Sequence, residues 1–299
     1  MGNKDIVGTI LFAISFLGVI FNWTVIIYQK RVLCLKQSFG VITRNQAIGD
    51  AIQSTTVLFL VSPMIIFEID FLLANSSVIS FSLLLGYEIS VLSHFLLSCN
   101  RFCAVIVPLG YDKYFSLTTT NILLALVNMY AVTTCFLYYA FGCHYYWNND
   151  LWMFTYHILN KCDTISFFGL FCKYFFIIIF VLILDLITAY KAKRLWRKIL
   201  SRQSSSSRKL KSKELYFLIQ TCAQGALFGM ELVSYFLISP HVDNQWIRFC
   251  LTTVMFCSIH SIDGALSIIC NMEFRVLLRK MVVKKDSVKS VSQPKTGQQ

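Results

Sequence analysis

The residues best suited to chemistry lie where a long apolar stretch ends, in the order Asn100-Arg101-Phe102 followed by Pro108 and Tyr111. Arginine stays charged and presents five N–H donors in a planar fork. A charged side chain at the end of an apolar stretch is costly unless it reaches water or has a function. Reversible binding of a carboxylate or of backbone carbonyl groups is the chemistry that this side chain can supply. The pattern therefore marks Arg101 as a candidate functional residue.

A carboxylate for Arg101 is available at Glu214, which opens a later apolar stretch after a run of basic residues. Glu214 could pair with the guanidinium of Arg101. The alternative is a solvated carboxylate at a helix start, where the helix dipole favours negative charge.

Other polar side chains interrupt the apolar stretches themselves. Asn22, Asp50 and Asp263 lie in three different stretches. Polar groups hydrogen-bond between membrane helices, so each could be an ordinary contact residue. A carboxylate within hydrocarbon is rarer, and it indicates a function by default. We expect the three side chains to form one hydrated polar network.

A second set of ionisable residues indicates a ligand pocket. Glu88 precedes Arg101 on the same predicted helix and lies about 20 Å further out, at about 1.5 Å per residue. That depth suits the floor of an outward-facing pocket, although a buried ion pair without a ligand is an equal alternative. The other candidates for the pocket are Tyr87, Lys173, Glu231 and His260.

The composition requires lipid as the solvent for this chain. Apolar residues make up 56% of the 299 residues and charged residues 14%, whereas soluble domains carry about 25% charge. The net charge of +12 does not indicate a nucleic-acid partner, because the basic residues cluster between the apolar stretches, as membrane topology demands. We find no nucleophile–base pair, phosphate loop or metal-ligand spacing, so we predict no enzyme, no cofactor and no bound metal.

Seven stretches are long enough to position these residues across a membrane, since a helix that crosses about 30 Å of hydrocarbon needs roughly 20 residues. We predict an all-α membrane protein, a seven-transmembrane helix bundle in residues 1–283. The bundle would end in a short amphipathic eighth helix from Phe274 to Val283, and residues 284–299 would form a disordered cytoplasmic tail. The predicted spans are Ile6–Tyr28, Phe39–Ile66, Val78–Val107, Asn121–Phe141, Ile165–Tyr190, Leu215–Ile238 and Trp246–Cys270.

Most lysines and arginines lie on one side of the predicted membrane. The positive-inside rule therefore places the N-terminus outside and the C-terminus in the cytoplasm. The first span is too long for a signal peptide and is followed by basic residues, so we expect it to be retained as an anchor. The basic segment 191–213 is expected to lie against anionic lipid. Its serine-rich part, residues 201–212, is expected to be a flexible loop.

The loops predicted to lie outside carry two features of their own. Cys143 and Cys162 fall in the long loop between spans four and five. An oxidising outer space favours a disulfide between them, and two separate thiols are the alternative. Asn75 begins a glycosylation sequon in the first outer loop, close to the membrane.

The polar positions follow the order typical of rhodopsin-like receptors, with Asn22 in span one, Asp50 in span two and Arg101 at the end of span three. The chain departs from these receptors elsewhere: residues 263–267 read Asp-Gly-Ala-Leu-Ser in place of Asn-Pro-x-x-Tyr, span six lacks Cys-Trp-x-Pro, and Ser76 replaces the usual disulfide cysteine. These departures, together with three further motifs, resemble the Srx class of nematode serpentine chemoreceptors over nearly the whole chain. The motifs are Asn-Arg-Phe-Cys-Ala-Val at 100–105, Cys-x-Tyr-Tyr at 143–146 and Asn-x-Glu-Phe-Arg at 271–275.

The resemblance implies a G-protein-coupled chemosensory receptor in the plasma membrane, in the cilia of sensory neurons. Its partners would be a small odorant or water-soluble ligand, a heterotrimeric G protein and membrane lipid, and no oligomeric state is implied. Two other classes stay open, a multi-span transporter and an odorant-gated ion channel, the second with inverted topology. The residues that the resemblance assigns to G-protein coupling are Asn100, Arg101, Phe102, Pro108 and Tyr111, with Glu214 as the switch partner.

Overall fold

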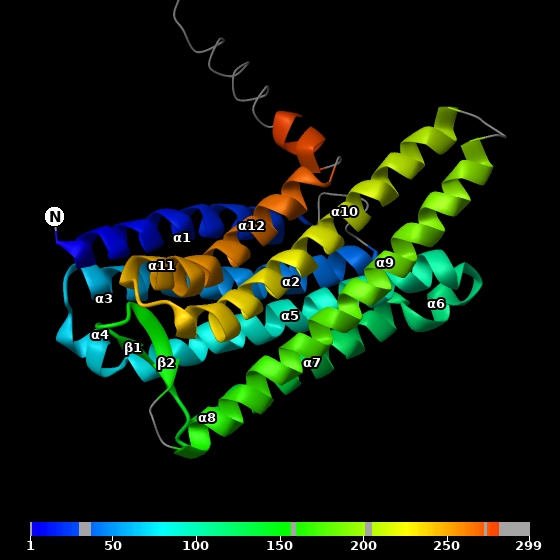
Figure 1. Cartoon of the computed structure of the whole chain (residues 1–299). Coiled ribbons are helices and arrows are strands. Elements are labelled where there is room, and N and C mark those ends of the chain that lie inside the picture. Colours follow the sequence, from blue (N-terminus) through cyan, green and yellow to red (C-terminus); the bar gives the residue numbers. More distant parts are fainter. Residues whose placement is uncertain (1, 30–36, 157–159, 201–204, 272–273, 281–299) are drawn as a thin grey trace, which may run out of the picture.

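The computed structural model describes residues 2–29, 37–156, 160–200, 205–271 and 274–280. Seven helices that are long and apolar enough to cross a membrane form one bundle (Figure 1). This arrangement confirms the predicted all-α, seven-transmembrane fold. The spans are Asn3–Tyr28, Ser38–Ile66, Ser76–Ile106, Leu117–Ala140, Thr164–Leu195, Tyr216–His241 and Gln245–Ile269.

Four of the spans consist of several helical segments. Span one is α1 (Asn3–Tyr28), span three is α5 (Ser76–Ile106) and span four is α7 (Leu117–Ala140). Span two joins α2 (Ser38–Thr56), η3 (Val57–Val61) and α3 (Ser62–Ile66). Span five joins α8 (Asn160–Ser166), η5 (Phe167–Cys172) and α9 (Lys173–Leu200). Span six joins α10 (Ser205–Val233), η6 (Ser234–Ile238) and η7 (Ser239–His241), and span seven joins α11 (Gln245–Phe249), η8 (Cys250–Val254) and α12 (Met255–Ile269).

Spans two and three form the centre of the bundle, which explains why span two tolerates so many polar residues. In their most apolar windows 67% and 56% of the residues are buried, against 17% in span four at the periphery. A Cβ added at Gly49 would lie 2.6 Å from the carbonyl oxygen of Gly86, and one added at Gly86 would lie 2.7 Å from that of Gly49. Only glycine allows so close a backbone approach. The approach brings the polar side chains of α2 directly against α5.

The faces of the spans that point away from the bundle are apolar. Large side chains on α1, α7 and α9 are exposed, among them Phe16, Phe136 and Phe176. Soluble monomers rarely expose apolar surface of this extent. Lipid is the solvent that suits such faces, in agreement with a multi-pass membrane protein.

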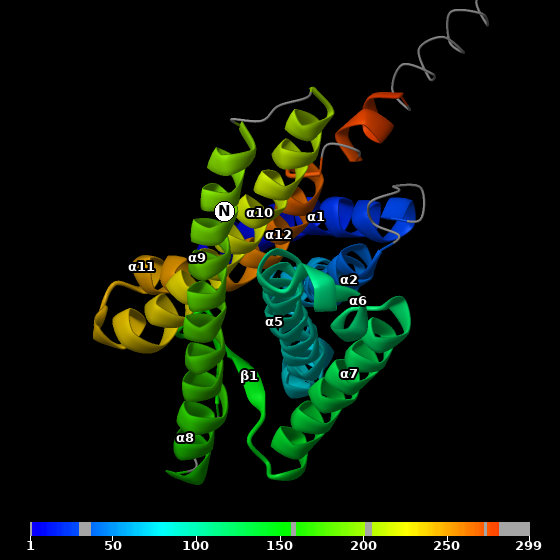
Figure 2. The same ribbon diagram turned by 90° about the vertical axis from the view of Figure 1, so that its right-hand side faces the viewer.

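A β-hairpin covers one end of the bundle, which we call the hairpin end (Figure 1). β1 (Tyr145–Asn148) and β2 (Met153–Tyr156) pair antiparallel. Cys143 and Cys162 are joined in a disulfide across the base of this loop, as the sequence predicted. In Figure 2 the hairpin strand β1 lies between α7 and α8, the two helices that this loop connects.

Two serines at the start of span three tie this helix to the hairpin. Ser76 accepts a hydrogen bond from the backbone N–H of Trp147 at 3.4 Å, and the Ser80 hydroxyl donates to the carbonyl of Tyr145 at 2.7 Å. Ser76 is the position at which rhodopsin-like receptors have a disulfide cysteine. Hydrogen bonds therefore tether the hairpin to the start of span three.

The sequon residue Asn75 lies between α4 (Asp70–Ala74) and α5. Its side-chain amide donates a hydrogen bond to the carbonyl oxygen of Phe71 at 2.7 Å. Glycosylation of Asn75 stays a prediction, and it would require this hydrogen bond to open.

The opposite end of the bundle differs from the sequence expectations in two places. α10 begins at Ser205, so most of the serine-rich stretch expected to be a loop is helical. The lysines, arginine and leucine that follow the serines are good helix formers, which explains the longer helix. Span four begins at Leu117 instead of at residue 121, because Ser116 caps it by accepting the N–H of Thr119 at 3.1 Å.

A short helix follows span seven at residues 274–280, where the sequence predicted the start of an eighth helix. Asn271 caps it, since its side-chain oxygen accepts the N–H of Phe274 at 3.1 Å. The Phe274 ring is fully buried and fixes the direction in which this helix leaves the bundle. Residues 281–283 and the predicted tail, residues 284–299, lie outside the described residues.

Candidate functional site

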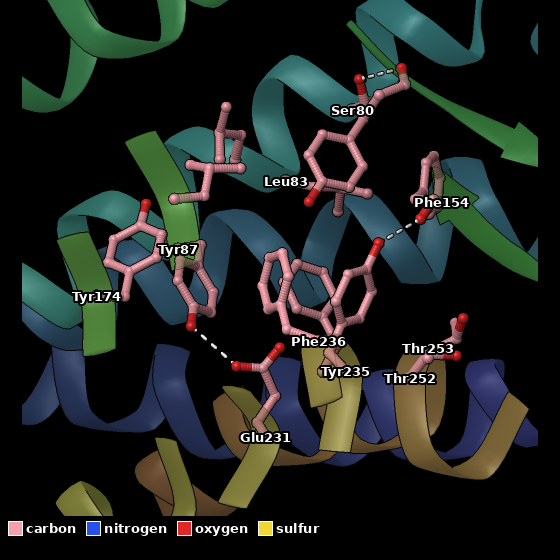
Figure 3. Close-up of a pocket in the computed structure, with 14 residues that line it drawn as sticks. Ser80, Leu83, Tyr87, Phe154, Tyr174, Glu231, Tyr235, Phe236, Thr252 and Thr253 are labelled. Atoms are coloured by element: carbon pink, nitrogen blue, oxygen red, sulfur yellow. Dashed lines mark hydrogen bonds between the residues drawn. The ribbon is translucent and has the colours of Figure 1, made fainter. Parts of the chain in front are cut away.

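A cavity lies in the hairpin half of the bundle, between spans three, five, six and seven and under the hairpin (Figure 3). Its volume is about 60 Å³, counted as the space open to the centre of a water-sized sphere. One water molecule takes roughly 10–15 Å³ on this measure, so the cavity suits a small molecule. It is lined by Ser80, Leu83, Leu84, Tyr87, Tyr145, Phe154, Leu170, Tyr174, Glu231, Tyr235, Phe236, Thr252, Thr253 and Phe256.

Stretches of π-helix supply the cavity wall on three of these spans. Leu170 belongs to η5, Tyr235 and Phe236 belong to η6, and Thr252 and Thr253 belong to η8. Such stretches are rare and occur frequently at functional sites. Each inserts a wider turn into its span, and the three wide turns face one cavity.

Most hydroxyl groups of the wall already donate hydrogen bonds to the protein. The Thr253 hydroxyl donates to the carbonyl of Trp152 and the Tyr235 hydroxyl to the carbonyl of Phe154, each at 2.8 Å. The Thr252 hydroxyl donates within its own span, to the carbonyl of Arg248 at 2.7 Å. These bonds hold the hairpin down on spans six and seven and leave the wall largely aromatic.

Glu231 is the acidic residue in this wall, and Tyr87 is its hydrogen-bond partner. The Tyr87 hydroxyl donates to Glu231 Oε2 at 2.9 Å, and Figure 3 shows the carboxylate pointing from α10 toward that hydroxyl. Glu231 is 4% exposed. Among the described residues that line the cavity, none is a lysine, arginine or histidine. The structure therefore places two of the predicted pocket residues, Tyr87 and Glu231, on the cavity wall.

Glu88 and Lys173, two further pocket candidates, form an ion pair behind the wall. The Lys173 ammonium donates to Glu88 Oε1 and lies 4.3 Å from the centre of the Tyr174 ring. Glu88 is fully buried, and neither residue lines the cavity. This geometry matches the alternative weighed for Glu88, a buried pair without a ligand.

The predicted polar network of spans one, two and seven is assembled around His260, the fifth pocket candidate. His260 Nδ1 lies 2.6 Å from Asp50 Oδ1, which also accepts the Ser90 hydroxyl at 2.7 Å. Asn22 donates to the backbone carbonyl of His260 at 2.9 Å. Asp263 is buried nearby and accepts a hydrogen bond from Gln46 of span two at 3.1 Å, separate from the hydrogen bonds of Asp50. These side chains are all buried.

Aromatic rings connect the cavity wall with this network. Tyr87 stacks on Phe256 with ring centres 5.6 Å apart, and its ring meets the His260 ring edge-on at 5.8 Å. Tyr87 thus touches a cavity group, Glu231, with its hydroxyl and the network histidine with its ring.

Two buried ionisable residues escaped the sequence analysis. His94 on α5 packs its ring 5.8 Å from that of Phe228, and Asp185 on α9 lies beside Ser98 and Thr221. The sequence could have revealed them, since both are ionisable residues within apolar spans. Among the residues that the structure describes, no group of three or more His, Cys, Asp or Glu side chains could hold a metal ion.

Arg101 lies at the end of the bundle opposite the hairpin, with its guanidinium between two phenylalanine rings. The guanidinium carbon is 3.6 Å from the centre of the Phe39 ring and 4.6 Å from that of Phe217. These rings come from α2 and α10, so Arg101 joins three spans. The side chain of Glu214, its predicted partner, lies outside the described residues.

The other residues of the Arg101 motif lie beside it. Asn100 donates a hydrogen bond to the Tyr111 hydroxyl at 3.0 Å. Phe102 is half-buried, whereas Pro108 is exposed at the start of η4 (Pro108–Gly110). Tyr111 begins α6 (Tyr111–Tyr114), so the hydrogen bond fixes this connecting segment against the end of α5.

Comparison with known proteins gives consistent results in sequence and in structure. The model of the family described as "Serpentine type 7TM GPCR chemoreceptor Srx" matches residues 12–271. The chain is 26% identical over 294 residues to "Serpentine receptor class X 45" of Caenorhabditis elegans, covering 92% of this chain and 81% of that protein. It is 29% identical over 272 residues to "Serpentine receptor class X-43" of the same organism, covering 84% and 79%. The crystal structure of squid rhodopsin has a similar fold, with a TM-score of 0.73, 15% identity and coverage of 98% of this chain and 88% of that one.

Proposed function

Since this chain belongs to the Srx family of serpentine seven-transmembrane chemoreceptors, and so is a chemosensory G-protein-coupled receptor, we propose that a small ligand in the hairpin-end cavity controls how Arg101 meets a heterotrimeric G protein. The transporter and ion-channel alternatives lose their support, because the family is one of receptors. The ligand, the G protein and the residues that contact them are part of the proposal.

One observation carries this proposal: the same two helices reach both sites. α5 carries Tyr87 at the cavity and Arg101 at the opposite end, about 20 Å apart at about 1.5 Å per residue. α10 carries Glu231 at the cavity and Phe217 against the Arg101 guanidinium. A shift of α10 relative to α5 therefore changes both sites at once.

We take as the resting arrangement the one in which the guanidinium of Arg101 lies between Phe39 and Phe217. A ligand that binds more tightly to a second arrangement of α5 and α10 would populate it in proportion to that difference in affinity. Withdrawal of Phe217 would uncover the Arg101 donors for the G protein. Coupling between such sites is typically 1–3 kcal/mol.

The orientation in the membrane is also part of this proposal, with the hairpin end outside and Arg101 inside. It is supported by the lysine and arginine distribution of the sequence. An epitope placed after Met1 would be accessible on intact cells, and one placed at Gln299 only after permeabilisation. The plasma membrane of sensory cilia is the proposed location.

The experiment that tests the proposal replaces Arg101 in cells that carry a second-messenger reporter. Arg101→Ala is expected to abolish most ligand-dependent output, while Arg101→Lys keeps the charge but loses the planar fork and is expected to weaken output. Surface level and ligand binding are measured for the same cells. Ligand binding should largely survive, because the cavity is far from the change.

Lys113→Ala provides the matched control, since Lys113 is an exposed basic residue of the same end, in α6. Its output is expected to stay near wild type. If Arg101→Ala reaches the surface and signals at wild-type strength, Arg101 is not the coupling residue and the proposal fails.

A further inference from the structure

The charge balance of the cavity is uneven. Within the part of the chain that the structure describes, Glu231 is the acidic residue of its wall and no basic side chain lines it. The hydrogen bond that the structure gives Glu231 comes from a neutral phenol, that of Tyr87. A buried carboxylate is costly unless a cation or several donors compensate it. Glu231 is 4% exposed, so a ligand could supply the positive charge that would compensate its carboxylate.

The remainder of the wall suits a cation as well. The rings of Tyr87, Tyr174, Tyr235, Phe236 and Phe256 belong to the wall that also carries the carboxylate. Figure 3 shows those of Tyr87, Tyr235 and Phe236 near Glu231. Ring faces carry partial negative charge and attract ammonium groups, most strongly where water is excluded. The same rings and the Glu231 carboxylate disfavour an anion.

The hydroxyl donors of the wall give a neutral ligand little to bind. Five of these hydroxyl groups already donate to protein oxygens, those of Ser80, Tyr87, Tyr235, Thr252 and Thr253. A ligand that donates a hydrogen bond therefore finds an acceptor in Glu231, whereas a ligand that only accepts meets mostly occupied donors, the buried hydroxyl of Tyr174 being the exception.

From these contacts we propose that the cavity recognises a small amine: a protonated amino group bound by Glu231, attached to an apolar or aromatic body that packs against the rings. The inference rests on the proposed function, because it assigns the ligand class of the same cavity. The volume of about 60 Å³ limits the body to a single ring or a short branched chain.

The test uses the purified full-length chain and thermal unfolding, because a ligand of the folded state raises the Tm. The probes are 2-phenylethylamine, 2-phenylethanol and phenylacetic acid, which share one body and differ in the head group. Isoamylamine, isoamyl alcohol and isovaleric acid form a second, smaller series. We expect a saturable rise in Tm with an amine in at least one series and no comparable rise with its alcohol or acid.

Glu231→Gln keeps the shape of the side chain and an acceptor for Tyr87 but removes the charge. We expect it to weaken amine affinity about 10- to 100-fold, the range for a hydrogen bond to a charged group. Asp150→Asn is the matched control, since it removes an exposed carboxylate from the same end of the bundle without touching the cavity wall, and it should leave amine affinity near wild type.

Three results would overturn the proposal: no amine raises the Tm, the alcohol or acid raises it as much as the amine, or Glu231→Gln binds the amine as tightly as wild type. If Glu231→Gln does not fold, the comparison of head groups on the wild-type chain decides alone. An amine that binds through Glu231 without a second-messenger response would refute the proposed function and leave this inference standing. A neutral agonist that signals through Arg101 would support the proposed function and refute the inference that the ligand is an amine.

Discussion

Two glutamates of the hairpin half are both buried, yet they are satisfied in different ways. Glu88 is fully buried and is paired with the ammonium of Lys173. Glu231 is almost as buried, but the partner that the structure gives it is the neutral hydroxyl of Tyr87. Burial alone therefore does not distinguish the two residues. The charge of the partner does, and so does the position of Glu231 on a cavity wall.

The comparison separates a structural charge from one that is available to a ligand. The Glu88–Lys173 pair closes on itself between α5 and α9, because each charge is the counter-ion of the other. Glu231 stands beside a cavity, where a second molecule can supply the missing positive charge. Changes at Glu88 should therefore act on folding, and changes at Glu231 on ligand binding.

The largest expected effect comes from Glu88→Gln, because it leaves the Lys173 ammonium inside the bundle without a counter-ion. Breaking a buried pair by removing one partner destabilises a protein by about 3–5 kcal/mol. We expect a strong loss of surface level and a lower Tm. Glu231→Gln, which leaves no unpaired charge, should lose much less.

The double variant Glu88→Gln with Lys173→Met removes both charges and is the control for this prediction. Replacing both partners of a buried pair is often nearly neutral, so surface level should recover most of the loss. If the double variant is as unstable as the single one, the pair is not what makes Glu88 structural.

Loss of the disulfide in the hairpin loop gives the next largest effect. It should change the cavity that contains Glu231, and so affect ligand binding. Cys143 and Cys162 close a loop with a sequence separation of 19, for which the chain-entropy model gives about 3 kcal/mol. Tyr145 and Phe154 of the hairpin line the cavity. Cys143→Ser should therefore lower both surface level and ligand affinity.

Cys162→Ser should behave in the same way, and the double serine variant should be no worse than either single one. The measurement is surface level and ligand-induced rise in Tm for the three variants. Losses that add in the double variant would show that the two thiols act independently.

Asp50 adds a third kind of carboxylate to the comparison, because its partner His260 is a hydrogen-bonding ring. Asp50→Asn keeps an acceptor for His260 and for the Ser90 hydroxyl, so the loss of stability should be below about 1 kcal/mol. Asp50→Ala leaves both groups buried without their acceptor, which is expected to lower stability by about 1–3 kcal/mol. The measurement is the Tm of the two variants, which compares their losses of stability. Equal losses would mean that the charge of Asp50 is required, as we expect for Glu88.

The sequence predicted the fold because the physical signal for it is strong and local. Long apolar stretches can only be helices that cross lipid, and the capping residue Asn271 follows the last of them. The polar network was also accessible, since Asn22, Asp50 and Asp263 interrupt three such stretches. What the spacing could not give is the direction of each side chain around its helix axis.

The missing side-chain directions explain why some of the five pocket candidates line the cavity and others do not. Tyr87 and Glu88 are neighbours in sequence, but consecutive residues of a helix point about 100° apart. One therefore meets the cavity and the other meets Lys173 on α9. The π-helical turns of spans five, six and seven shift this direction again, and no motif of the sequence marked them. Phe39, which stacks on Arg101, had no signal at all, because a phenylalanine at a span end is ordinary.

The last prediction tests the comparison most directly, since it changes the hydroxyl group that donates to Glu231 and leaves ligand affinity almost unaltered. Tyr87→Phe keeps the ring, with its contacts to Phe256 and His260, and removes the hydrogen bond to Glu231 Oε2. Without a ligand the carboxylate loses its donor, so stability should fall by about 1–3 kcal/mol. A bound amine should then raise the stability of the variant by more than it raises that of the wild-type chain, because the amine no longer shares the Glu231 carboxylate with the Tyr87 hydroxyl. We expect amine affinity to stay the same or to rise a few-fold while the Tm of the free protein falls. A parallel loss of stability and of amine affinity would instead mean that the Tyr87 hydroxyl positions Glu231, and that the two glutamates differ less than their partners suggest.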